Sequence, residues 1–138
     1  RARNPYNALV LSACAETPPP ALRRGIALFN QGEFFAQHEI LEDLWREESR
    51  PIRRLYQGIL QIGVALHHIQ RHNYHGAVVM LNKGPACLRP FTPACQGIDV
   101  ADLLARAARI LEAVERLGPN HLGEFDWSLA PNIRLVHR

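Results

Sequence analysis

Apolar residues recur along this chain with the three-to-four-residue period of helices, and no segment shows the two-residue alternation of a strand. Prolines, glycines and capping residues divide the pattern into five segments. These predict helices over residues 17–32, 33–48, 51–71, 73–83 and 98–119. Short links between them favour an all-α, single-domain bundle of about five helices, built from antiparallel helical hairpins.

Several residues are placed to begin or end these helices. Thr17, Asn73 and Asp99 are expected as N-caps, and Gly118-Pro119 is expected to terminate the last predicted helix. Gly84-Pro85 is expected to interrupt the fourth helix, because proline lacks a backbone N–H group and its ring crowds the preceding turn. The domain 1–138 is then an N-terminal arm (1–16), a helical core (17–119) and a C-terminal tail (120–138). In the tail, an exposed Phe125 or Trp127 would mark a dimer contact.

The helix over 33–48 has polar residues on its apolar face. At about 100° per residue, the apolar arc around His38 holds five residues: Phe34, Phe35, Leu41, Leu44 and Trp45. Glu42 falls at about +40° from His38, inside this arc, whereas Glu39 and Asp43 face solvent. A carboxylate so placed needs a partner or a raised pKa.

The next helix offers partners for this pair. Residues 55–70 contain no Asp, Glu, Lys or Arg, which predicts a helix buried on most sides. Gln57, Gln61 and His68 share one arc of this helix, and the two helices are expected to be antiparallel neighbours. We therefore expect His38, Glu42, Gln57, Gln61 and His68 to form one partly buried polar site.

A family resemblance rests on the same residues. Three features carry it: His38, Glu42 and Trp45 in an HxxxExxW pattern, Gln57-Gly58 with Gln61, and Asn73 with Gly76-Ala77. Over about residues 22–82 the chain resembles the domain of unknown function 309 family of small bacterial and archaeal proteins. The resemblance implies an all-α fold and a histidine–glutamate motif suggested as part of an active site. Relatives tend to continue the helix where this chain has Lys83-Gly84-Pro85.

Three hypotheses fit this site, two of them catalytic and one structural. His38, Glu42 and His68 would hold a divalent metal such as iron, zinc or manganese for a hydrolase or oxidase. Alternatively, Glu42 orients the imidazole of His38 for metal-free acid–base chemistry, while Gln57 and Gln61 position a substrate. The third hypothesis is structural: the His–Glu pair fixes helix packing, and Trp45 covers it.

A non-enzymatic alternative is an interaction module in which helical hairpins form a groove for a partner chain. Most other histidines are expected at the surface or at the rim of the site: His67, His72, His75, His121 and His137. The sequence names no partner, and homo-oligomerisation is left open.

Composition limits the location and the kinds of partner that we expect for this chain. Apolar residues are 47% and charged residues 21% of the chain, and the longest apolar run, 59–66, is too short for a membrane span. Cys14, Cys87 and Cys95 form no CxxC pair, so neither a disulfide framework nor a thiolate zinc site is expected, and a reducing cytoplasm is predicted. The net charge is +3, but the arginines are dispersed apart from a cluster at 50–54, so no nucleic-acid partner is expected.

Overall fold

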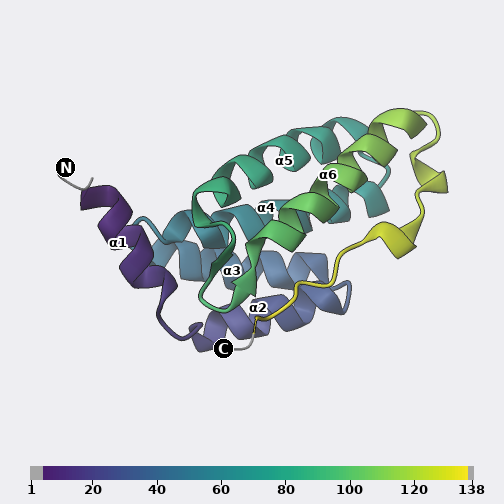
Figure 1. Ribbon diagram of the computed structural model, residues 1–138. Coiled ribbons are helices and arrows are strands. Elements are labelled where there is room, and N and C mark those ends of the chain that lie inside the picture. The colour runs from purple at the N-terminus through teal and green to yellow at the C-terminus, as the bar shows by residue number, and fades with distance from the viewer. Residues whose placement is uncertain (1–4, 137–138) are drawn as a thin grey trace.

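The computed structural model describes residues 5–136 and confirms an all-α fold (Figure 1). The helices are α1(Pro5–Cys14), α2(Pro20–Asn30), α3(Phe34–Glu47), α4(Arg53–Gln70), α5(Tyr74–Leu88) and α6(Val100–Leu117). Three short 3-10 helices are η1(Arg89–Phe91), η2(Leu122–Glu124) and η3(Trp127–Leu129). A small antiparallel hairpin, β1(Ala94–Cys95) and β2(Ile98–Asp99), was not predicted.

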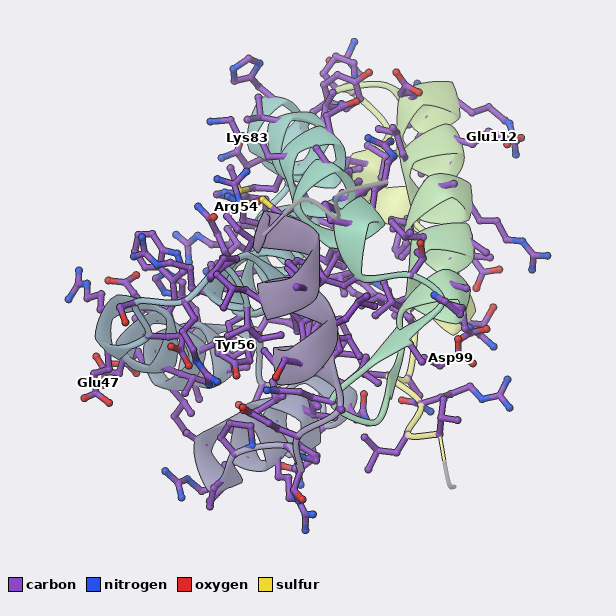
Figure 2. The ribbon with its side chains drawn as sticks, turned by 60° about the vertical axis from the view of Figure 1, so that its left-hand side comes forward. Glu47, Arg54, Tyr56, Lys83, Asp99 and Glu112 are labelled. Atoms are coloured by element: carbon purple, nitrogen blue, oxygen red, sulfur yellow. A yellow bond between two sulfur atoms is a disulfide. The ribbon has the colours of Figure 1, made fainter. Side chains whose placement is uncertain are left out.

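Each helix from α2 to α5 packs on the next helix in the chain. Helix α4 lies between α3 and α5 and supplies ten buried residues, including Tyr56, Ile59 and Ile62. Charged side chains such as Glu47, Lys83 and Glu112 project outward (Figure 2). Within residues 5–136, no helix is long and apolar enough to cross a membrane.

Two of the three predicted N-caps are present. The Asn73 side chain accepts a hydrogen bond from the Gly76 N–H (2.9 Å), and the Asp99 side chain accepts one from the Asp102 N–H (3.0 Å). The prediction for Thr17 is wrong, because α2 begins at Pro20 and its N-cap is Pro19. Three consecutive prolines after Thr17 keep the chain out of the helical region until the last of them.

The expected interruption at Gly84-Pro85 is also wrong, since α5 continues through both residues to Leu88. Gly84 lets α4 and α5 approach closely: a Cβ atom at Gly84 would lie 3.1 Å from the Gly58 carbonyl oxygen, and one at Gly58 would lie 3.0 Å from that of Gly84. Pro85 removes one N–H donor but is buried within the packed helix. Tertiary packing therefore overrides the local helix-breaking signal.

The predicted N-terminal arm contains helix α1. The expectation that the cysteines form no disulfide framework is contradicted by one disulfide. Cys14 at the end of α1 is bonded to Cys95 in β1, 81 residues away. Beside the disulfide, Gln96 is fully buried: its backbone N–H donates to the Cys14 carbonyl (2.8 Å) and its carboxamide to that of Ala13 (3.2 Å). The Tyr56 hydroxyl donates to the Gln96 side-chain oxygen (2.9 Å), so α1 is attached to the core through α4.

The C-terminal tail runs along the bundle and contributes to its core. Leu122, Phe125 and Ile133 are buried, and the Asn30 side chain pairs with both backbone groups of Ile133. Phe125, 5% exposed, is therefore not the exposed residue proposed for a dimer contact. Trp127 is 41% exposed, and its role in such a contact remains a prediction.

The disulfide makes a measurable contribution to stability. Under non-reducing conditions, we expect one thiol, that of Cys87, to react after denaturation. Cys14→Ser should lower the free energy of unfolding by about 2–5 kcal/mol, because the unfolded chain regains the entropy of an open loop. Urea denaturation with and without reductant measures this, with Cys87→Ala as the control. Three reactive thiols and no effect of reductant would contradict the bond.

Candidate functional site

His38 and Glu42 lie together on α3, as their spacing predicts. His38 Nε2 is 2.8 Å from Glu42 Oε2, and the other carboxylate oxygen contacts the Arg46 guanidinium, one further turn along the helix. The side chains of His38 and Glu42 are 33% and 27% exposed, so the pair is half-buried and reachable from solvent. Glu42 lies one helical turn from His38 and one turn from Arg46, so its carboxylate contacts both basic groups on the same face of α3.

A small hollow adjoins this pair. It has a volume of about 190 Å³ and is lined by Phe34, Phe35 and His38 from α3 and by Val64 and His67 from α4. The Phe35 ring is centred 6.4 Å from that of His38 and 6.0 Å from that of His67. Phe35 is 59% exposed, so its assignment to the apolar arc does not make it a core residue. The hollow therefore combines apolar walls with two imidazole rings.

The glutamines of α4 face a different helix. The Cys87 thiol of α5 lies 3.8 Å from Gln57 Oε1 and 3.7 Å from Gln61 Oε1, so its single S–H group can donate to either oxygen. Leu60 and Gly63, on another side of α4, contact α3 through Gln37. The structure thus does not join the glutamines to His38 in one site.

His68 and Trp45 have separate surroundings as well. His68 Nδ1 is 3.3 Å from the Asn73 side-chain nitrogen, at the turn before α5. The Arg53 guanidinium lies 4.7 Å from the Trp45 ring centroid, an arrangement typical of a cation–π contact. Among residues 5–136, no three His, Cys, Asp or Glu side chains are grouped to hold a metal, so the described geometry offers His38 and Glu42 as a pair without His68.

The remaining histidines largely follow expectation. His72, His75 and His121 are exposed, whereas His67 is half-buried and lines the hollow. His137 lies outside the described residues.

Gln37 is a buried polar residue that the sequence interpretation missed. It is fully buried; its Nε2 donates to the Leu60 carbonyl of α4 (3.3 Å), and its Oε1 has no partner within the described chain. A Cβ atom at Gly63 would overlap the Gln37 carboxamide. The helical projection contained a signal, because Gln37 also falls inside the apolar arc around His38. Gln37, rather than Glu42, is the polar group enclosed between α3 and α4.

Comparisons with known proteins agree with the family resemblance. Residues 22–80 match the family described as Domain of unknown function (DUF309), so the resemblance is confirmed over this segment. A relative, the uncharacterized protein YpuF of Bacillus subtilis (strain 168), is 33% identical over 86 residues, covering 60% of this chain and 49% of the relative. An uncharacterized protein of Aquifex aeolicus (strain VF5) is 24% identical over 95 residues, covering 68% and 28%. The chain thus spans half or less of the length of these relatives, and neither name gives an activity.

The Gln37–Gly63 contact yields a prediction about stability. Gly63→Ala should lower the free energy of unfolding by about 1–3 kcal/mol, because the new methyl group overlaps the Gln37 side chain. Adding Gln37→Ala should recover part of this loss by clearing the space. A double-mutant cycle in urea measures the coupling between the two positions. Strictly additive effects would show that the two residues do not meet.

His68 makes stability depend on pH. Burial, followed by the nearby charge of His67, lowers the pKa of His68 below its usual 6.5. The unfolded chain then takes up a proton near pH 6.5 that the folded protein resists, so stability falls as the pH drops below that value. Urea denaturation at about pH 7.5 and pH 5.5 should show a smaller loss for His68→Gln than for the parent, with exposed His75→Gln as the control. Equal losses in all three proteins would contradict the assignment.

Proposed function

We propose that the hollow beside His38 binds a small, mainly apolar molecule and that His38 exchanges a proton with it. The observation that carries this proposal is the 2.8 Å contact between His38 Nε2 and Glu42 Oε2 at the edge of an apolar hollow. Sites for small molecules typically combine apolar walls with a few placed polar groups. The role of DUF309 members is not defined by the relatives, so the proposal depends on this geometry.

The geometry favours one direction of proton transfer. A carboxylate beside Nε2 holds the ring proton on that nitrogen, which leaves Nδ1 as the atom that accepts a proton. Glu42 then stabilises the imidazolium that forms, and Arg46 keeps the carboxylate in place. His67, on the opposite wall, supplies a second imidazole. The chemistry is therefore acid–base catalysis or proton-coupled binding, without a covalent nucleophile.

The other hypotheses have less support. A metal-dependent hydrolase or oxidase would need a ligand beyond His38 and Glu42, and His68 instead contacts Asn73. A purely structural role suits the enclosed Gln37 better than the half-exposed His38. An interaction module remains an alternative on one observation, the exposure of Phe35 at the edge of the hollow.

A binding experiment with a small aromatic acid tests the proposal. We expect 4-fluorophenol, followed by fluorine NMR, to bind saturably and to bind better than fluorobenzene, which has no proton to donate. His38→Gln should weaken this binding about tenfold or more, because the acceptor nitrogen is lost. Exposed Glu39→Gln, on the same helix, is the matched control.

The stability of the variants distinguishes a functional role of His38 and Glu42 from a structural role in helix packing. His38→Gln and Glu42→Gln should change the free energy of unfolding by less than about 1 kcal/mol, because the pair is solvent-accessible. A loss of several kcal/mol together with no binding of either probe would favour the structural hypothesis. Equal binding of fluorophenol by the parent and His38→Gln would remove His38 from the site.

A further inference from the structure

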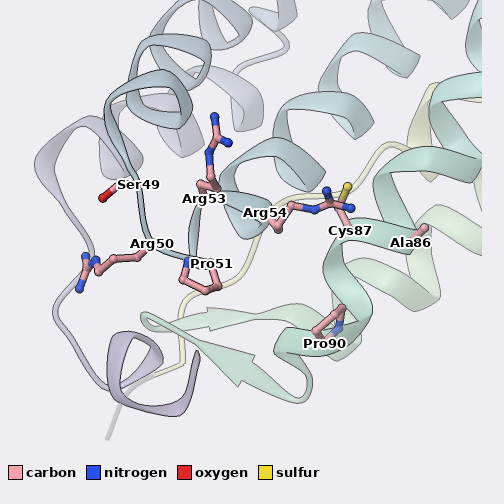
Figure 3. Close-up of a pocket in the computed structure, with 8 residues that line it drawn as sticks. All are labelled: Ser49, Arg50, Pro51, Arg53, Arg54, Ala86, Cys87 and Pro90. Carbon is pink, nitrogen blue, oxygen red and sulfur yellow. The ribbon is translucent and has the colours of Figure 1, made fainter. Parts of the chain in front are cut away.

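A pocket of about 360 Å³ opens between the start of α4 and the end of α5 (Figure 3). Three arginines line it, but their side chains diverge. Arg50 is paired with two glutamates, and the Arg53 guanidinium lies over the Trp45 ring. Arg54 extends toward Cys87 (Figure 3). The charged groups of this pocket therefore do not converge on one ligand position.

Another pocket, of about 380 Å³, lies between α2 and the C-terminal tail, which passes along α2 in Figure 1. It is lined by Pro18, Arg23, Ile26, Gly97, Leu135 and Val136. Among the described residues, the guanidinium of Arg23 is the one charged group in this lining, and the other walls are apolar. The pocket thus combines apolar walls with one positive charge.

The tail forms an outer edge beside the β1–β2 hairpin, because a bridge joins Leu135 to β2. The Arg134 carbonyl accepts a hydrogen bond from the Asp99 N–H (2.9 Å). The Val136 N–H donates one to the Gly97 carbonyl (2.6 Å). Alternate residues of an antiparallel strand direct their backbone groups to opposite edges. The N–H and C=O groups of Leu135 therefore point away from β2, and they have no hydrogen-bond partner within residues 5–136.

The side chain of Asn30 shows what this outer edge binds. Two residues before Leu135, Ile133 directs its own backbone groups to the same edge. The Asn30 carboxamide nitrogen donates to the Ile133 carbonyl (3.2 Å), and the carboxamide oxygen accepts from the Ile133 N–H (2.8 Å). Leu135 instead lines the pocket, with Arg23 and Ile26 of α2 on its other side. An amide group from outside the chain would pair with Leu135 as Asn30 pairs with Ile133.

Arg23 supplies a free positive charge to this pocket. Its side chain is exposed and makes no ion pair within residues 5–136. Glu16 lines an adjoining hollow, but its carboxylate is paired with Arg50 (2.6 Å). The forked N–H groups of a guanidinium match the oxygens of a carboxylate. A carboxylate is therefore the group that complements Arg23.

We propose that this pocket binds the C-terminal residue of an extended peptide. The backbone of that residue pairs with Leu135, its carboxylate contacts Arg23, and its apolar side chain packs beside Pro18 and Ile26. Asn30 already occupies the neighbouring edge position, so the edge accepts one further residue, which suits a chain end. Strand addition and capture of a C-terminal carboxylate are both recurring modes of peptide recognition.

The apolar residues of the tail are consistent with such a ligand. The side chains of Leu135 and Val136 are 46% and 42% exposed, and a bound apolar side chain would cover part of this surface. This proposal is independent of the proton-transfer site, which lies between α3 and α4.

Calorimetric titration of the parent protein with acetyl-alanyl-alanyl-leucine tests the proposal. We expect saturable binding of the peptide acid and about tenfold weaker binding of its C-terminal amide, because the charge-assisted contact to Arg23 is lost. N-methylation of the leucine should also weaken binding about tenfold, because it removes the donor to the Leu135 carbonyl. N-methylation of the preceding alanine, whose N–H faces the other edge of an extended chain, is the control.

Two protein variants locate the carboxylate. Arg23→Gln should lower the affinity for the peptide acid to that for the amide and leave the binding of the amide unchanged. Arg24→Gln removes the same charge from the next residue, which is exposed and outside the pocket lining, and should bind as the parent does. Circular dichroism verifies that both variants are folded.

Four results would overturn the proposal. These are no saturable binding by the parent, equal binding of acid and amide, equal effects of the two N-methylations, and equal weakening by Arg23→Gln and Arg24→Gln. Sedimentation of the parent at several concentrations tests a second copy of the chain as the occupant. A dimer that the peptide does not dissociate would assign this edge to self-association instead.

Discussion

The enclosure of α4 is the constraint on which the rest of the structure depends. Between Leu55 and Gln70 this helix has no Asp, Glu, Lys or Arg, and α3 and α5 pack against two of its sides. A helix so enclosed needs close approach to its neighbours and a partner for each polar group it presents. The approach to α5 occurs where Gly58 meets Gly84, and the approach to α3 occurs where Gly63 admits the Gln37 carboxamide.

Enclosure also divides the polar residues of α4 between two neighbours. Gln57 and Gln61 turn to Cys87 on α5, whereas His67 turns to the hollow beside α3. The His38–Glu42 pair consequently depends on α3 alone for its internal geometry, with α4 forming only the facing wall. The four-residue spacing on α3 therefore holds His38 and Glu42 together, whereas the packing of α3 against α4 determines the shape of the hollow beside them.

Sequence patterns predict the features that depend on local geometry. Helical period and capping chemistry locate five helices and the caps Asn73 and Asp99, and the four-residue spacing brings His38 to Glu42. Features that depend on distant contacts were missed or misjudged. The Cys14–Cys95 bond requires the ends of α1 and β1 to meet, and α5 passes Pro85 because Gly84 packs on α4. The glutamines were assigned to the wrong neighbour because a helical projection gives relative angles within one helix but not the rotation of that helix in the bundle.

Position along α4 explains why two separate pockets lie beside this one helix. Arg53 and His67 are 14 positions apart on α4, which is roughly 21 Å along a helix with a rise of 1.5 Å per residue. One pocket uses the charged first turn, where α4 emerges from the core, and the other uses the last turns, where histidine replaces aliphatic residues. The uncharged middle of α4 lies between them and is fixed by Tyr56, Ile59 and Ile62 in the core. Charged side chains and histidines are thus confined to the two ends of α4, because most of its middle is buried in the core.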